Sequence, residues 1–117
     1  MKQPDDRGRL QDMLESAEEA AALSRGKTRA DMDADRVLNL ALTRLLEIIG
    51  EAAARISPEF RQRHAEIPWP DIIGLRNRLI HDYRDVDFDI LWRIIDRDLP
   101  TLIAGLASIL ENEEGEK

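Results

Sequence analysis

Apolar residues recur every three or four positions along almost the whole chain, and no segment alternates apolar and polar residues for the length of a strand. This spacing gathers apolar side chains on one face of an α-helix. In 117 residues, such faces are buried when several helices pack against one another. We therefore predict an all-α fold, an up-and-down bundle of four to five helices that forms a single domain over residues 1–117.

Glycine and proline residues divide the first half of this pattern into elements. The apolar stripe from Leu10 to Leu23 predicts a first helix that ends near Gly26, and Thr28 to Asp33 is interpreted as a connection. A second, longer helix is predicted from Val37 to Ile56. It ends at Ser57-Pro58, because proline disfavours helical geometry in the residue before it.

The next segments are shorter. A helical turn is expected from Pro58 to His64. A third helix is expected to begin at Pro70, where the missing N–H of proline is tolerated, and to fray around Asp82-Tyr83.

A fourth helix should complete the bundle. Asp85 or Asp87 is expected to cap it, and its apolar pattern runs from Phe88 to Leu110. Pro100 falls inside this pattern and is expected to kink the helix rather than end it. Residues 111–117 are expected to form a solvated acidic tail.

The predicted second helix is apolar on two faces. Besides the stripe from Val37 to Ile56, a further face carries Leu38, Leu42, Leu46 and Ile49. A helix that is apolar most of the way round is usually covered on both sides. A second copy of the chain would cover the extra face, which predicts a homodimer. The alternative is that a kinked bundle covers this helix within one chain.

Composition excludes some kinds of site. The chain has no cysteine, which excludes disulfides, thiolate zinc sites and thiol nucleophiles. Residues 1–6 lack the apolar run of a signal peptide, and no apolar stretch approaches the ~20 residues that cross a bilayer, so we expect a soluble cytoplasmic protein. The net charge of −7 opposes phosphate binding, but residues 36–97 contain ten arginines, no lysine and ten acidic residues. The excess acidity therefore lies at the two ends.

The stretch from Arg76 to Tyr83 has the strongest chemical signal in the chain. It places a permanent cation at Arg76, a titratable imidazole at His81 and a phenol at Tyr83. Arginine binds phosphate through a planar fork of donors, and histidine exchanges protons near neutral pH. Together they supply what metal-free cleavage of a phosphodiester requires. The amide of Asn77 could orient His81 or the phosphate, or it could be a surface polar group.

Helical geometry affects how these residues could meet. On a regular helix Arg76 and Tyr83 share a face, whereas His81 is rotated by about 140° from Arg76. One copy would not aim Arg76 and His81 at a common point unless the helix unwinds near Ile80. Two copies crossing at a two-fold axis could instead form a composite cleft, so the spacing favours a dimeric site.

Other polar and aromatic residues have simpler interpretations. His64, which follows Arg61 and Arg63, is expected to be solvated. Trp69 and Trp92 could stack on bases, but the bundle core or a dimer interface is the expected use. Four aspartates lack the glycine and the terminal glutamate of a calcium loop, so helix capping explains them better, and we expect no metal site and no cofactor. These aspartates are Asp82, Asp85, Asp87 and Asp89.

Arg76, four intervening residues, His81, one more residue and Tyr83 resemble the Arg-x4-His-x-Tyr signature of the HepT-like toxins, within the HEPN superfamily of helical ribonucleases. The flanks agree, since Trp69-Pro70-Asp71-Ile72-Ile73-Gly74-Leu75-Arg76-Asn77 is similar to the lead-in of that family. Residues 83–87, 91–92 and 98–100 are similar to its continuation. The resemblance runs from about Asp35 to Leu110.

The resemblance implies a HEPN-like homodimer and metal-independent cleavage of RNA, with Arg76 and His81 as catalytic residues and Asn77 in support. His81 would accept the proton of the 2′-hydroxyl or protonate the leaving oxygen, and Arg76 would stabilise the phosphoryl oxygens. It also implies a partner, a minimal nucleotidyltransferase (MntA-like) antitoxin. That partner would transfer AMP to Tyr83, which places bulk and negative charge where an RNA phosphate must bind.

A second class of function stays open. The acidic net charge also fits a non-catalytic helical binding module that complexes a minimal nucleotidyltransferase and binds nucleotide in its dimer cleft. The complete Arg–His–Tyr motif favours the ribonuclease. RNA cleavage by the purified protein would separate the two.

Overall fold

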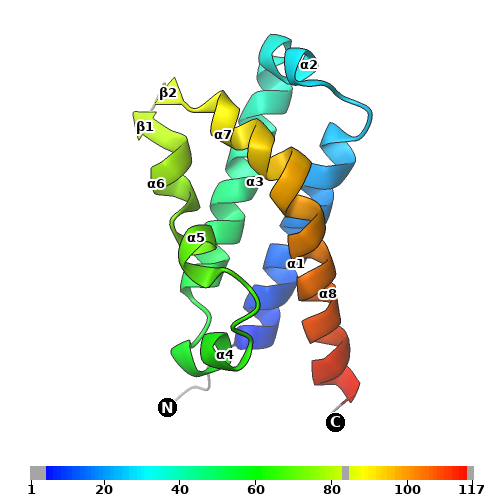
Figure 1. Cartoon of the computed structure of the whole chain (residues 1–117), viewed down its shortest axis with the longest axis vertical. Coiled ribbons are helices and arrows are strands. Elements are labelled where there is room, and N and C mark those ends of the chain that lie inside the picture. Colours follow the sequence, from blue (N-terminus) through cyan, green and yellow to red (C-terminus); the bar gives the residue numbers. More distant parts are fainter. Residues whose placement is uncertain (1–4, 83–84, 116–117) are drawn as a thin grey trace.

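The computed structural model describes residues 5–82 and 85–115. In Figure 1 the helix at residues 6–24 runs up, the helix at 36–54 runs down, the short helices at 69–79 lead back up, and the last long helix runs down. The predicted mostly helical fold is confirmed, with one short antiparallel hairpin as an exception within the described ranges. None of the helices in these ranges is both long and apolar enough to cross a membrane. The elements, in chain order, are α1 (Asp6–Ser24), α2 (Arg29–Ala34), α3 (Arg36–Ala54), α4 (Pro58–Arg63), α5 (Trp69–Ile73), α6 (Leu75–Leu79), β1 (Ile80–Asp82), β2 (Asp85–Val86), α7 (Phe88–Arg93), the π-helix η1 (Ile94–Asp98) and α8 (Leu99–Gly115).

The segment between α1 and α3 contains a short helix, α2, where the sequence predicted a connection from Thr28 to Asp33. Thr28 and Asp31 form a capping box. The Thr28 hydroxyl accepts a hydrogen bond from the Asp31 N–H at 3.1 Å, and the Asp31 carboxylate accepts one from the Thr28 N–H at 2.8 Å. The prediction was wrong because so short a helix, in which Met32 is the buried residue, has no periodic apolar stripe.

One carboxylate fixes the start of α1 to the turn between α3 and α4. Asp6 accepts hydrogen bonds from the N–H and the hydroxyl of Ser57, at 2.8 and 2.7 Å. The same hydroxyl accepts a hydrogen bond from the N–H of Phe60 and so caps α4, which matches the predicted turn from Pro58 to His64 within one residue. α1 ends just before Gly26, as predicted, and the φ of +74° at this glycine lies in the left-handed region.

The predicted third helix is interrupted at Gly74 and ends at Leu79, several residues before the expected fraying at Asp82-Tyr83. Ile80 is already extended, with φ −112° and ψ 107°. It pairs with Val86 in the hairpin of β1 and β2. The prediction was wrong because strand pairing with a later segment, which local spacing cannot show, replaced the last helical turn.

α7, η1 and α8 follow one another as the predicted fourth helix, and Asp87 rather than Asp85 caps it. The irregularity expected at Pro100 lies just before it, in η1, where the N–H of Leu99 donates to the carbonyl of Ile94, five residues back. α8 continues to Gly115, so the segment predicted as an acidic tail is helical as far as it is described.

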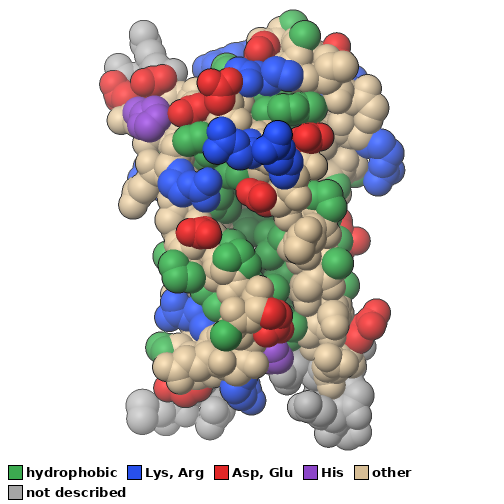
Figure 2. All heavy atoms as spheres, viewed as in Figure 1, with side chains coloured by type: hydrophobic (Ala, Val, Ile, Leu, Met, Phe, Trp, Pro, Cys, Tyr) green, Lys and Arg blue, Asp and Glu red, His purple; other side chains and the backbone are tan. Residues whose placement is uncertain are grey.

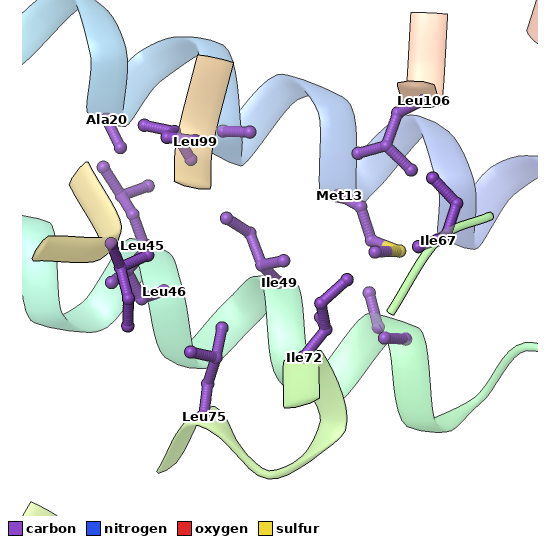
Figure 3. Packing of buried hydrophobic residues seen from close by; sticks show 14 of the residues in the cluster. Met13, Ala20, Leu45, Leu46, Ile49, Ile67, Ile72, Leu75, Leu99 and Leu106 are labelled. Atoms are coloured by element: carbon purple, nitrogen blue, oxygen red, sulfur yellow. The ribbon is translucent and has the colours of Figure 1, made fainter. Parts of the chain in front are cut away.

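The core forms where α1, α3 and α8 meet the chain around α5 and α6 (Figure 3). Residues from all of these elements point into it. Those labelled in Figure 3 are Met13, Ala20, Leu45, Leu46, Ile49, Ile67, Ile72, Leu75, Leu99 and Leu106, all of them buried.

Both apolar faces of α3 contribute to this single core. The face predicted to need a second copy is buried within one chain: Leu38 is 7% exposed, and Leu42, Leu46 and Ile49 are fully buried. α1 packs against one side of α3, and α5 and α6 pack against it elsewhere. The intrachain alternative is therefore correct for this face, and the face provides no argument for a dimer. On the stripe that runs from Val37 to Ile56, Val37 is 78% exposed and Leu40 is 49% exposed.

The close approach of α3 to α5 predicts a sharp effect at Gly50. A Cβ added there would lie 2.9 Å from the backbone carbonyl oxygen of Ile72, which cannot move without shifting α5. Gly50→Ala should therefore lower the free energy of unfolding by about 1–3 kcal/mol. Urea unfolding followed by circular dichroism measures this change.

Gly105→Ala is the matched control in α8. Its Cβ would meet the terminal Cδ1 of Ile67 at 2.9 Å, and that flexible end can rotate away. Alanine also favours a helix over glycine by about 1 kcal/mol. The control should therefore keep its stability, and equal unfolding curves for the two variants would contradict the close packing of α3 on α5.

Candidate functional site

His81 lies on β1, the first strand of the hairpin, which directly follows helix α6. α6 ends at the buried Leu79, whose carbonyl accepts a hydrogen bond from the N–H of Asp87 at 2.8 Å. Ile80 pairs with Val86, which extends the chain through His81. The side chain of His81 is 53% exposed as a result.

The imidazole of His81 faces the carboxylate of Asp87, with Nε2 3.7 Å from Oδ2. The other carboxylate oxygen, Oδ1, accepts a hydrogen bond from the N–H of Ile90 at 3.1 Å. The Ile90 N–H, and after it the imidazole, lowers the pKa of Asp87 below its usual value, so this group is a carboxylate at neutral pH. One side chain thus caps α7 and presents a negative charge to His81.

Arg76 lies on α6, beside α3. Its Nε is 3.5 Å from Oε2 of Glu47, and Arg44 approaches the same oxygen at 4.0 Å. The side chain of Glu47 is 17% exposed, whereas that of Arg76 is 64% exposed. This ion pair adds little stability in so exposed a place. Because the contact is made through Nε, it does not occupy the two terminal nitrogens of the Arg76 guanidinium.

Arg76 and His81 therefore lie on consecutive elements, α6 and β1, and both are exposed. The helix unwinds at Ile80, which is the condition for a site within one chain. Among the hydrogen bonds and ion pairs of residues 5–82 and 85–115, none joins these two side chains, and each faces a different acid. Asn77 is exposed on α6, and its supporting role stays a prediction. Tyr83 lies outside the described residues, so its role also stays a prediction.

His64 is not the solvated residue that the sequence predicted. Its side chain is 18% exposed and its ring packs on Phe60, with the centroids 4.5 Å apart. Its carbonyl accepts a hydrogen bond from the indole N–H of Trp69 at 2.9 Å. Trp69 is 5% exposed and Trp92 is half-buried against the core, so both have the expected structural use.

Two acids beside the candidate residues were missed from the sequence. Glu47 lies on α3, far from Arg76 in the sequence, and no local pattern connects them. Asp87 was predicted only as a cap, because its second contact requires a hairpin. Asp89 instead forms an ion pair with Arg29 of α2 at 2.6 Å. In the described part of the chain, no three His, Asp or Glu side chains cluster as metal ligands do.

A groove of ≈ 670 Å³ opens between α5 and the η1–α8 segment. Figure 2 shows hydrophobic side chains in this hollow and basic side chains between it and the hairpin end of the molecule. Its apolar lining includes Leu46, Ile49, Ile72, Leu75, Leu99 and Leu102. Its charged lining consists of Glu66, Asp71, Arg78, Arg97 and Asp98.

A family model described as "Ribonuclease HepT-like" matches residues 13–109, which include all of the candidate site. The chain belongs to the HepT-like ribonuclease family. The resemblance found in the segment from Arg76 to Tyr83 is thereby confirmed, and the match also includes the helices that hold this segment in place.

Three relatives of this HepT-like chain are similar to it over most of their length. A protein of Caldanaerobacter subterraneus subsp. tengcongensis, named "Putative RNase", is 38% identical over 97% of this chain and 100% of its own. A protein of Methanocaldococcus jannaschii with the same designation is 35% identical over 87% of this chain and 94% of its own. "Probable ribonuclease HepT" of Thermococcus cleftensis is 38% identical over 80% of this chain and 84% of its own. No solved structure gave a significant match.

Proposed function

We propose that this HepT-like protein is an endoribonuclease that cleaves RNA through the 2′-hydroxyl without a metal ion, as the toxin of a toxin–antitoxin pair. The observation that carries the proposal is the exposure of Arg76 and His81 on consecutive elements, with α6 ending between them. The names of the relatives, which designate ribonucleases, support it.

In the proposed reaction the 2′-oxygen bonds to phosphorus while the bond from phosphorus to the 5′-oxygen breaks. The products are a 2′,3′-cyclic phosphate and a free 5′-hydroxyl. His81 accepts the proton of the 2′-hydroxyl or donates a proton to the leaving 5′-oxygen, each worth about 10²–10⁴-fold in rate. The guanidinium of Arg76 binds the phosphoryl oxygens as their charge increases.

The purified protein should cleave RNA in the presence of EDTA. His81→Ala and Arg76→Ala should each lower the rate about 100-fold or more, because each removes a group that contacts the reacting phosphate. Both side chains are more than half exposed, so their loss leaves no core cavity, and the circular dichroism spectrum should not change.

Arg25→Ala is the control for general loss of positive charge, since Arg25 is exposed at the C-terminal end of α1, a helix that contributes no residue to the candidate site, and should not affect cleavage. Cleavage is measured on a labelled single-stranded RNA. If the folded parent protein leaves this RNA intact, the proposal is wrong and the non-catalytic binding module replaces it.

The proposal includes a homodimer in which two copies meet at the groove between α5 and the η1–α8 segment. Leucine and isoleucine side chains line the groove, and among them Leu102 is only partly buried within one chain. Its charged lining contains both arginines and acids, so a two-fold pairing can place Arg78 or Arg97 of one copy against an acid of the other. α6 contributes Arg78 to the groove and Arg76 to the site, so a second copy would lie beside the site.

Light scattering should therefore give a dimer mass at micromolar concentration. Leu102→Arg places a charge in the groove and should give a monomer with an unchanged helical spectrum. Leu23→Arg is the matched control, because Leu23 is 40% exposed on α1, outside the groove. A parent protein with a monomer mass would contradict the dimer, and a dimeric Leu102→Arg variant would exclude the groove as its interface.

The proposal also includes silencing by a minimal nucleotidyltransferase (MntA-like) that transfers AMP to Tyr83. Tyr83 follows β1 in the sequence, two residues after His81. An AMP group brings negative charge and bulk to the hairpin that carries His81. Arg76 would attract this charge, so the adduct would compete with an RNA phosphate.

Co-expression with such a nucleotidyltransferase should add one or more AMP units to the chain and abolish cleavage. Intact-mass spectrometry measures the adduct. Tyr83→Phe should carry no adduct and stay active, since the ring remains and the acceptor oxygen is lost. His81→Ala should still accept AMP, which makes it the control for an intact hairpin. An undiminished adduct on Tyr83→Phe would mean that the acceptor is another residue.

A further inference from the structure

We infer that Asp87 is a positioning residue for His81: its carboxylate holds the imidazole through Nε2 and leaves Nδ1 to exchange a proton with RNA. This inference deepens the proposed function and rests on it. Hydrogen bonds of the fold bind the backbone of Asp87 and one of its carboxylate oxygens. The other carboxylate oxygen faces the imidazole of His81.

Three hydrogen bonds hold Asp87 in place. Its N–H donates to the carbonyl of Leu79 at 2.8 Å, and its carbonyl accepts from the N–H of Leu91 at 3.0 Å. Its Oδ1 accepts from the N–H of Ile90 at 3.1 Å. Leu79 and Leu91 are both fully buried, so the residue is tied to the core from two directions. The position of Asp87 is therefore set by the fold and not by His81.

The remaining oxygen, Oδ2, lies 3.7 Å from Nε2 of His81. A carboxylate at this place favours, in the neutral ring, the tautomer with its proton on Nε2. Such a ring presents Nδ1 as the acceptor. Because more than half of the His81 side chain is exposed, packing alone does not fix the ring, and a partner such as Asp87 can set its orientation.

Other charged groups lie on the elements around β1. In the described part of the chain they are Arg76 and Arg78 of α6, Asp82 of β1 itself, Asp85 of β2, and Asp89 and Arg93 of α7. Asp85 carries the same charge on the same hairpin, where it pairs with Asp82 across the strands. It therefore provides a control that separates the specific contact of Asp87 from the summed charge of the hairpin.

The test is nitrogen NMR of the two histidines in the full chain. Asp87→Asn keeps the cap on Ile90, because asparagine caps helices as well as aspartate does, and it removes the charge. The tautomer of His81 should change in this variant. The tautomer of His64 should not change in Asp87→Asn, and Asp85→Asn should keep that of His81.

Nitrogen chemical shifts distinguish the two tautomers. Neutral His81 should have its proton on Nε2 in the parent chain, and Asp87→Asn should mix the two tautomers. If Asp87 acts only as a helix cap, Asp87→Asn will match the parent in the tautomer of His81, and the inference will be overturned.

Kinetics then connect the contact to cleavage. Asp87→Asn should lower kcat about tenfold and leave KM within about twofold, because Asp87 does not touch RNA. An unchanged kcat would overturn the positioning role. A changed His81 tautomer in Asp87→Asn, together with a parent protein that cleaves no RNA, would instead contradict the proposed function.

Discussion

The hydrogen bond from the N–H of Asp87 to the carbonyl of Leu79 is the interaction on which the candidate site depends. A helix end leaves carbonyls without partners, and here a residue beyond the hairpin supplies one. The bond ends α6, closes β1 on β2 and starts α7 at a defined place. Without it, His81 would continue the helix and lie about 140° around the axis from Arg76. A single main-chain contact thus decides whether the cation and the imidazole lie on one helix or on two elements.

Element ends that are set by local chemistry could be predicted from the sequence. Gly26 and Ser57-Pro58 act through their own backbone preferences: α1 and α3 end just before these residues, and α4 begins at Pro58. The hairpin could not be predicted, because Leu79 and Ile80 continue a helical apolar spacing and the competing partner, Val86, acts from across the turn. Periodicity reports what a segment prefers alone, and tertiary pairing overrides it where a better partner is near.

The candidate site shows the same division. Residue types at Arg76 and His81 were enough to indicate phosphate and proton chemistry, but the two acids that face them lie on α3 and at the start of α7. The faces of α3 were also recognised from spacing. The segments that cover these faces could not be predicted, because an apolar stripe that contains Leu42 has the same spacing whether the same chain or a second copy covers it. Only the path of the chain through α5 and α6 decides this question.

The π-helix η1 has a consequence for how this segment can change in evolution. In an unbroken α-helix, Leu91 and Leu99 would be about 80° apart around the axis, yet both are buried. The wider turn of η1 corrects this phase difference, so the helix before it and the helix after it present one continuous apolar face. Loss of a single residue between Ile94 and Asp98 would restore regular hydrogen bonding and still leave Leu91 and Leu99 on one face, because seven residues make nearly two α-helical turns. The length of this turn can therefore change by one residue without turning the following helix away from the core.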